Sequence, residues 1–320
     1  MWRLLALALL HLARTAADTS TAERIRSGQT SSFEEISRHL ARAFRHEHDL
    51  RAYVSIFGAE ALRAAAARDA DTANGFSRGR LHGVPFAIKD LFALDGYATR
   101  AGFATAVWEA ERNATAVQTL LDEGAILLGT TRLTEGAWTE YASACLADGA
   151  CPPRNPFGAE LWAGDSSSGC GVGVAAGFFP FCLATDTSGS IRNPCLMNSL
   201  TCVKPRRDVL SGDGVWPLSQ RLDTVGVMAR TAAEIGSVLG HAVDAAASGL
   251  RLGVDWALVA AAEAESVQPT LRDAYELERG ELAYPLDPKS SDAGAATLLF
   301  GGALLTLTAV VAGAFFLVLV

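Results

Sequence analysis

Three short, wholly apolar runs divide a chain whose remaining pattern is largely helical. They cover residues 84–88, 125–128 and 178–184, and each follows directly on a glycine. A run without a polar position on either face is typical of a strand that other elements cover on both sides. We therefore predict three buried strands in this part of the chain.

Helical patterns lie between these runs. Ser32 with Glu35 predicts a capping box at the start of the first helix. Apolar residues then recur at a spacing that places them on one helix face: Phe33, Ile36, Leu40 and Phe44. Further helices are predicted over 59–68, 115–121 and 170–177. Apolar strands that alternate with helices predict an α/β fold with a mixed, mostly parallel sheet flanked by helices.

The beginning of the chain has a different pattern. Met1, Trp2 and Arg3 form a short cationic start, an apolar run follows over 4–13, and small residues follow that run. This order is typical of a secretory signal peptide, which we place at residues 1–17.

The end of the chain is also distinct. Residues 298–320 contain no charged side chain and are long enough to span a bilayer. Small and polar residues precede this run at 290–294, so we predict a signal for a GPI anchor over 290–320. An ordinary C-terminal transmembrane helix is the alternative. One domain is then expected over 18–289, in the secretory pathway and held at the membrane or cell surface by the C-terminal tail.

The charge of the chain limits its partners. The formal net charge is −8 and the isoelectric point is about 5.3. Binding to nucleic acid needs a basic surface, so we expect no nucleic-acid partner. The predicted secretory route makes Asn113-Ala114-Thr115 a glycosylation site at Asn113. Nothing in the sequence indicates an oligomeric state.

The secretory route also permits disulfides among the six cysteines. Cys145 and Cys151 flank a loop that contains glycine and proline, and we predict that they pair. The other cysteines lie among apolar residues and are equally consistent with buried thiols: Cys170, Cys182, Cys195 and Cys202. No spacing of cysteine and histidine predicts a metal site.

Hydroxyls and one lysine follow the apolar runs. A serine hydroxyl is a weak nucleophile and needs a base nearby. Lys89 follows directly on the first apolar run, where burial would lower its pKa and make the neutral amine available. The Ser- and Gly-rich run 164–169 offers an intermediate hydroxyl, and the turn at Gly189 and Ser190 can direct backbone N–H groups toward an oxyanion. These features together predict a serine hydrolase.

On these motifs the chain resembles the amidase signature family of serine hydrolases. Residues 81–90 are similar to the lysine segment of that family, 164–177 to its serine- and glycine-rich signature, and 185–192 to its nucleophile segment. Residues 203–205 and 222–231 resemble the segments that follow. The similarity extends from about residue 30 to about residue 235.

The resemblance implies a role for each matching residue. Ser190 would be the nucleophile, Ser166 the bridging serine that follows a cis peptide bond, and Lys89 the base. Backbone N–H groups would form the oxyanion hole at Thr187, Ser188, Gly189 and Ser190. Asp186 and Arg192 would support that loop. The implied reaction hydrolyses an amide through an acyl-enzyme, with no cofactor or metal, and the partner would be a small-molecule or lipid amide.

Two departures from the family leave alternatives open. Asp165 stands where the family usually has glycine, and a carboxylate there would favour the charged form of Lys89. The family also continues much further beyond residue 254, so the fold is expected to be abridged at its C-terminal part. We therefore keep three hypotheses: an active amidase, a catalytically silent amidase-like module for binding or assembly at a membrane, and a fragment that does not fold stably alone. The acyl and amine specificities are not determined by the sequence.

Overall fold

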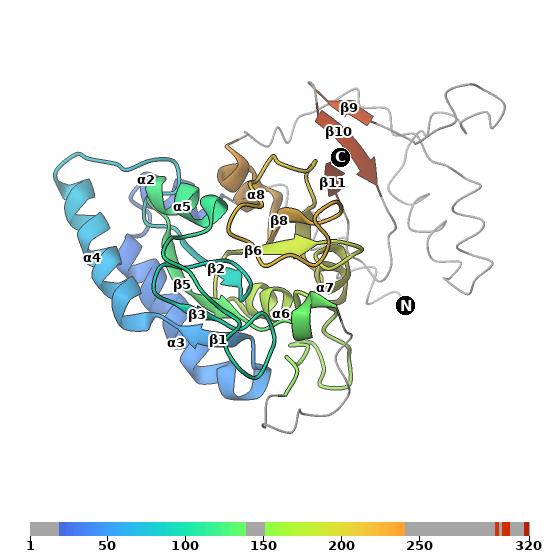
Figure 1. Cartoon of the computed structure of the whole chain (residues 1–320). Helices are drawn as coiled ribbons and strands as arrows, with labels where there is room; N and C mark the ends of the chain where they lie inside the picture. The colour runs from blue at the N-terminus through green and yellow to red at the C-terminus, as the bar shows by residue number, and fades with distance from the viewer. Residues whose placement is uncertain (1–18, 139–150, 241–297, 301–302, 308–316, 320) are drawn as a thin grey trace, which may run out of the picture.

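A computed structural model describes residues 19–138, 151–240, 298–300, 303–307 and 317–319 (Figure 1). The helices are α2 (Thr21–Arg26), α3 (Ser32–Leu50), α4 (Gly58–Ala73), α5 (Thr115–Asp122), the 3₁₀ turn η1 (Glu135–Ala137), α6 (Ser168–Ala176), α7 (Arg192–Met197) and α8 (Ala232–Leu239). The strands are β1 (Tyr53–Ile56), β2 (Pro85–Lys89), β3 (Ala98–Thr99), β4 (Trp108–Glu109), β5 (Ile126–Thr131), β6 (Phe181–Asp186), β7 (Thr201–Val203), β8 (Thr224–Ala229), β9 (Leu298–Phe300), β10 (Ala303–Leu307) and β11 (Leu317–Leu319). Strands β3 and β4 pair apart from the main sheet.

The main sheet is mixed, as the sequence predicts. Its described strands follow the order β1-β5-β2-β6-β8-β7-β11-β10-β9. Strand β2 runs parallel to both β5 and β6, and these three overlap the apolar runs identified in the sequence. Strand β1 is antiparallel to β5, and β8 is antiparallel to β6 and β7. The parallel part of the sheet is therefore its centre, between antiparallel neighbours.

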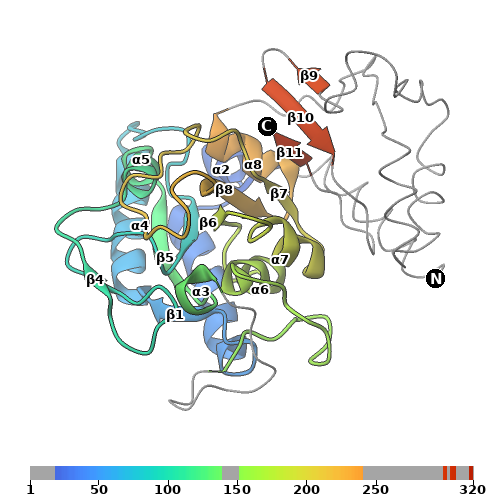
Figure 2. The ribbon, with the colours of Figure 1, turned by 45° about the vertical axis from the view of Figure 1, so that its right-hand side comes forward.

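Helices and loops cover both faces of this centre (Figures 1 and 2). On one face α3, α4 and α6 pack against the sheet, and on the other lie α2, α5 and α8. Side chains of β2 alternate between the two cores, since Phe86 and Ile88 belong to one and Ala87 to the other. This arrangement explains why the central strands have no polar face.

The first helices differ from the prediction in detail. The capping box of α3 is formed by Ser31 and Glu34, one residue earlier than predicted. Ile36 and Leu40 are buried, but Phe33 and Phe44 are 45% and 66% exposed, so the apolar face is narrower than the spacing suggested. Helix α4 also continues to Ala73, beyond the end predicted at residue 68. Alanines in that stretch favour helix, and this propensity prevails.

Several predictions concern residues outside the described part of the chain. The signal peptide over 1–17 and Cys145 are among them, so the Cys145–Cys151 pair stays a prediction. Of the helices that are described, none has the length and apolar sequence that crossing a bilayer requires. Asn113 is described: its side-chain oxygen accepts from the Asp95 amide at 2.9 Å, and its nitrogen donates to Gln118 at 2.8 Å. Its glycosylation also stays a prediction.

Two of the four cysteines whose state the sequence left open form a disulfide. Cys170 in α6 is bonded to Cys182 in β6, and both are fully buried. Cys195 and Cys202 are free buried thiols. The crosslink joins the helix that follows the serine-rich run to the strand that leads to Ser190.

Candidate active site

Two neighbouring parallel strands bring the candidate residues to one edge of the sheet. Strand β2 ends at Lys89, and β6 ends at Asp186, four residues before Ser190. Ala87 pairs with Cys182 and Ile88 with Leu183. The carboxyl ends of parallel strands in an α/β sheet are where ligands usually bind. The serine-rich run reaches the same edge just before α6.

Lys89 is in direct contact with the serine-rich run. Its side chain is fully buried, and Nζ donates to Ser166 Oγ at 2.7 Å and to Thr185 Oγ1 at 3.1 Å. The peptide bond between Asp165 and Ser166 is cis, the conformation that the family resemblance implies. The amine therefore has two hydroxyl neighbours, one of them the predicted bridging serine.

Burial decides the protonation of this lysine. Removal from water lowers the pKa of the Lys89 amine to about 7, against the opposing effect of the carboxylates of Asp186, Asp223 and Asp165. Asp165 acts in the direction expected from the sequence, but desolvation is the larger effect. Near neutral pH a substantial fraction of the amine is neutral and able to accept a proton.

The nucleophile loop lies beside the serine-rich run. The Ser167 amide donates to the Ser190 carbonyl at 3.2 Å, and the Thr134 amide donates to the Ser166 carbonyl at 3.2 Å. Within the described part of the chain, the Ser190 hydroxyl makes no hydrogen bond, and its residue is half-buried. Catalytic hydrogen bonds are often absent or long in a site without substrate.

Asp186 holds the loop that contains Ser190. Its carboxylate is fully buried; Oδ1 accepts from the Gly189 amide at 2.9 Å, and Oδ2 from the Ile191 amide at 3.1 Å. Arg192 donates to it through its amide and guanidinium, and Lys204 Nζ donates at 2.9 Å. Burial alone would raise the pKa of this carboxyl, but hydrogen bonds and charges of Arg192 and Lys204 hold it well below its usual range.

This bonding divides the predicted oxyanion-hole amides into two kinds. The Gly189 amide is directed at Asp186. The amides of Thr187, Ser188 and Ser190 donate to no acceptor among the residues that the structure describes. These three donors are consequently the ones available to a developing oxyanion.

Gly169 allows the serine-bearing helix to approach the sheet. A Cβ atom here would lie 2.4 Å from the Ala52 carbonyl oxygen and 2.5 Å from the Arg132 amide nitrogen. We expect Gly169→Ala to lower the free energy of unfolding by about 1–3 kcal/mol, since backbone atoms cannot give way as a flexible side chain can. Chemical denaturation measures this. Gly212→Ala is the matched control because open space surrounds that position, and equal losses would contradict the argument.

The sequence missed three residues that contact the predicted set. Thr185 accepts from Lys89, Lys204 donates to Asp186, and Asp223 accepts from Thr187 Oγ1 at 2.6 Å. All three lie in segments noted for their family resemblance, which was the available signal. Across the described ranges, no group of three or more His, Cys, Asp or Glu side chains is arranged to hold a metal ion.

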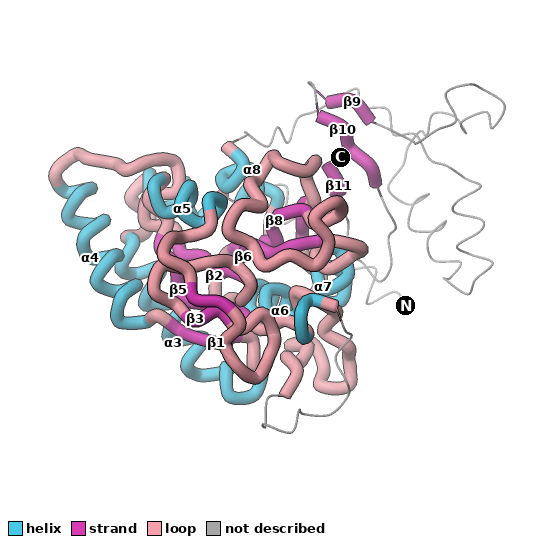
Figure 3. Tube along the Cα trace, viewed as in Figure 1, coloured by secondary structure: helices cyan, strands magenta, loops and turns pink. Residues whose placement is uncertain are grey.

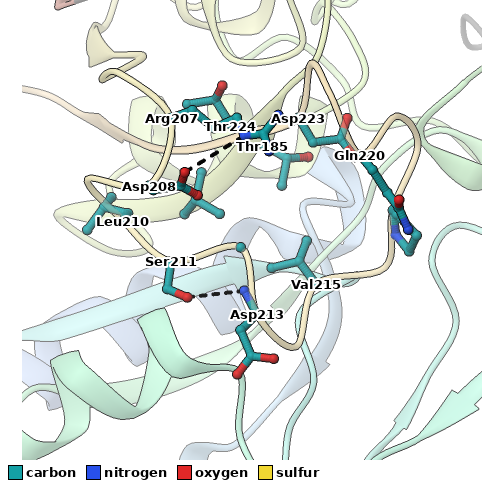
Figure 4. A pocket seen from close by; sticks show the side chains of 13 residues that line it. Thr185, Arg207, Asp208, Leu210, Ser211, Asp213, Val215, Gln220, Asp223 and Thr224 are labelled. Carbon is teal, nitrogen blue, oxygen red and sulfur yellow. Dashed lines mark hydrogen bonds and ion pairs between the residues drawn. The ribbon is translucent and has the colours of Figure 1, made fainter.

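A pocket of about 440 Å³ opens beside these residues (Figure 4). It lies between β8 and the loop that joins β7 to β8, which Figure 3 shows as a long irregular segment. Thr185 and Asp223 line it, together with polar side chains that include Arg207, Asp208 and Gln220. The pocket wall therefore includes Thr185, which accepts from Lys89, and Asp223, which accepts from Thr187.

Known proteins match most of this chain. Residues 34–248 match the family described as Amidase. The putative amidase AmiD of Mycobacterium tuberculosis is 36% identical over 261 residues, which cover 74% of this chain and 54% of the relative. Mandelamide hydrolase of Pseudomonas putida is 36% identical over 215 residues, which cover 64% of this chain and 42% of that protein. The chain thus spans about half the length of these curated relatives.

Solved structures show the same fold. The peptide amidase of Stenotrophomonas maltophilia aligns with a TM-score of 0.70 at 30% sequence identity, covering 85% of this chain and 62% of that one. A fatty acid amide hydrolase aligns with a TM-score of 0.64 at 23% identity over 72% of this chain and 41% of its own, which is a likeness of fold alone.

Proposed function

The chain belongs to the amidase family, and from this premise we propose that it hydrolyses carboxylic amides through an acyl-enzyme on Ser190. The observation that carries the proposal is the contact between Lys89 and Ser166, 2.7 Å from Nζ to Oγ. A fully buried lysine with a pKa of about 7 is a base suited to neutral pH. The nearby turn presents the Ser190 hydroxyl and three backbone amides without acceptors.

The proposed reaction begins at the Ser190 hydroxyl. Its oxygen attacks the amide carbonyl carbon while its proton passes to Ser166 Oγ, and Ser166 passes its own proton to Lys89 Nζ. The amides of Thr187, Ser188 and Ser190 stabilise the oxyanion. When the carbon–nitrogen bond breaks, the leaving amine takes a proton back along the same route. Water then attacks the acyl-enzyme by the same proton transfers, releasing the carboxylic acid and restoring Ser190.

The substrate that we propose is a small-molecule or lipid amide. Relatives support the bond type, because their names include a mandelamide hydrolase and a peptide amidase. The polar pocket beside Thr185 and Asp223 supports a substrate that carries hydrogen-bonding groups. Exposure at the cell surface, through the predicted signal peptide and tail, is part of this proposal.

Labelling with a serine-reactive fluorophosphonate tests the function. We expect the full-length protein to form one adduct, which peptide mapping places on Ser190 because that hydroxyl has the Ser166–Lys89 relay beside it. Ser190→Ala is the control and should remain unlabelled. An adduct on another serine would contradict the assignment. A cooperatively folded chain that never reacts would support the alternative, a silent amidase-like module for binding or assembly.

A further inference from the structure

A hydrogen bond connects the nucleophile loop to the loop that forms the pocket. Thr187, the first residue after β6, donates through Oγ1 to Asp223 Oδ1 at 2.6 Å. Asp223 immediately precedes β8, which is the antiparallel neighbour of β6. The bond therefore joins the end of β6 to the start of β8, at the same edge of the sheet where β2 ends at Lys89.

The other oxygen of Asp223 organises its own loop. Oδ2 accepts from the amides of Leu218 and Ser219, both at 2.9 Å. Through these bonds one half-buried carboxylate fixes the backbone of residues 218–223 and, at the same time, Thr187. A carboxylate that accepts three hydrogen bonds is a strong local constraint, since bonds to a charged group are worth more than neutral ones.

The carboxylates of Asp186 and Asp223 hold different parts of the loop 187–191. Asp186 holds the far side of the turn, through Gly189 and Ile191. Asp223 holds the near side, at Thr187. Two of the three amides without acceptors, those of Ser188 and Ser190, lie between these anchored positions. Asp223 also lines the pocket, so the same side chain belongs to the pocket wall and to the support of the loop.

We propose that Asp223 is a positioning residue that fixes the oxyanion loop against the wall of the pocket, through Thr187. The inference rests on the proposed function for its catalytic consequence, but the structural bond stands without it. The pocket and the oxyanion loop then act as one unit, because a change in residues 218–223 reaches Thr187 through a single carboxylate.

Two substitutions break the bond from opposite sides. Thr187→Val removes the hydroxyl and leaves the carboxylate, whereas Asp223→Asn removes the charge and weakens all three bonds. Thr187→Ser retains the hydroxyl and should behave like the wild type. Asp69→Asn is the matched control, because Asp69 is a half-buried carboxylate that also accepts two backbone amides, those of Ser32 and Phe33, at the start of α3.

Hydrogen exchange tests the structural part without any activity. We expect the amides of Gly189 and Ile191 to exchange about tenfold faster in Thr187→Val and in Asp223→Asn than in the wild type, because the loop opens more often. Thr187→Ser and Asp69→Asn should leave those amides unchanged. Wild-type exchange in both disruptive variants, or an equal acceleration in Asp69→Asn, would overturn the proposal.

The rate of fluorophosphonate labelling tests the catalytic part. We expect it to fall about tenfold in both disruptive variants, which is the effect of a loop that spends less time in the productive geometry. Faster exchange with an unchanged labelling rate would overturn the catalytic role. A wild type that does not label at all would instead contradict the proposed function, while the exchange result would still decide the structural bond.

The dependence of labelling on pH separates two effects of Asp223: the effect of its hydrogen bond on the loop, and the effect of its charge on the pKa of Lys89. Three carboxylates raise the pKa of Lys89, those of Asp186 in β6, Asp223, and Asp165 in the serine-rich run. Asp223→Asn should therefore move the acid limb of the labelling rate to lower pH. Thr187→Val keeps the carboxylate and should leave that limb in place. A shift of the acid limb in Thr187→Val as well would contradict the assignment of the positioning effect to the hydrogen bond.

Discussion

Replacing Lys89 with methionine is expected to give a protein that is more stable but almost inactive. The folded state holds this amine fully buried and lowers its pKa from 10.5 to about 7. One pKa unit corresponds to about 1.4 kcal/mol, so burial costs roughly 5 kcal/mol at neutral pH. Loss of the bonds to Ser166 and Thr185 offsets part of the gain. We expect a net increase of about 2–3 kcal/mol in the free energy of unfolding.

The stability difference between Lys89→Met and the wild type should depend on pH in a definite direction. Between pH 7 and 10.5 the unfolded lysine binds a proton that the folded lysine does not, so wild-type stability rises with pH across this window. Methionine has no such proton, and the advantage of Lys89→Met should shrink from pH 7 toward pH 10. Denaturation at both pH values measures it. A stability advantage that does not change with pH would contradict the argument.

Activity should respond in the opposite direction. Without its base, Ser190 is expected to react about 10²–10⁴-fold more slowly with the fluorophosphonate. In the wild type the labelling rate should fall tenfold per pH unit below about pH 7, as Lys89 becomes protonated. A methionine variant that labels at the wild-type rate would show that another group is the base.

Asp186→Asn is expected to destabilise the protein by about 3–5 kcal/mol and to stop labelling. The change removes the charge that Arg192 and Lys204 face, and it presents an NH₂ group to donors. The amides of Gly189 and Ile191 also lose a charged acceptor, so the loop that contains Ser190 should no longer hold its shape.

Denaturation above pH 5 measures this loss. Because the pKa of Asp186 is held below its usual range, its contribution is present at neutral pH and is lost as the pH falls below about 4. Asp213→Asn is the control: this carboxylate is exposed and bonded to Arg112, so its replacement should change stability little. Similar losses in the two variants would contradict the role given to burial.

Short-range signals in the sequence were sufficient for the centre of the fold. Uninterrupted apolar runs located β2, β5 and β6. Strands that are covered on both faces are apolar at every position, so each of them stands out in the sequence as a short continuous run. The motifs that contain Lys89 and Ser166 also indicated which side chains would meet. The contact of Lys89 with Thr185 depends on the parallel strands β2 and β6, which end together, and this follows once the α/β pattern is recognised.

Long-range partners could not be predicted in the same way. The bond from Thr187 to Asp223 joins residues 36 positions apart in the sequence, and it exists only because β8 returns beside β6. The disulfide between Cys170 and Cys182 required a helix to pack on the next strand, which the sequence left as one choice among several. The exposure of Phe33 and Phe44 likewise depends on how far the neighbouring helix covers α3, not on spacing.

The buried disulfide has a consequence for how the folded protein could be observed. Neither sulfur of Cys170–Cys182 is accessible to solvent, so a dissolved thiol can reach the bond only when α6 moves away from β6. The rate at which a reductant breaks the bond therefore measures how often the core opens between α6 and β6. The rate of reduction by a small thiol would report local opening in the part of the molecule where the proposed chemistry needs a fixed geometry.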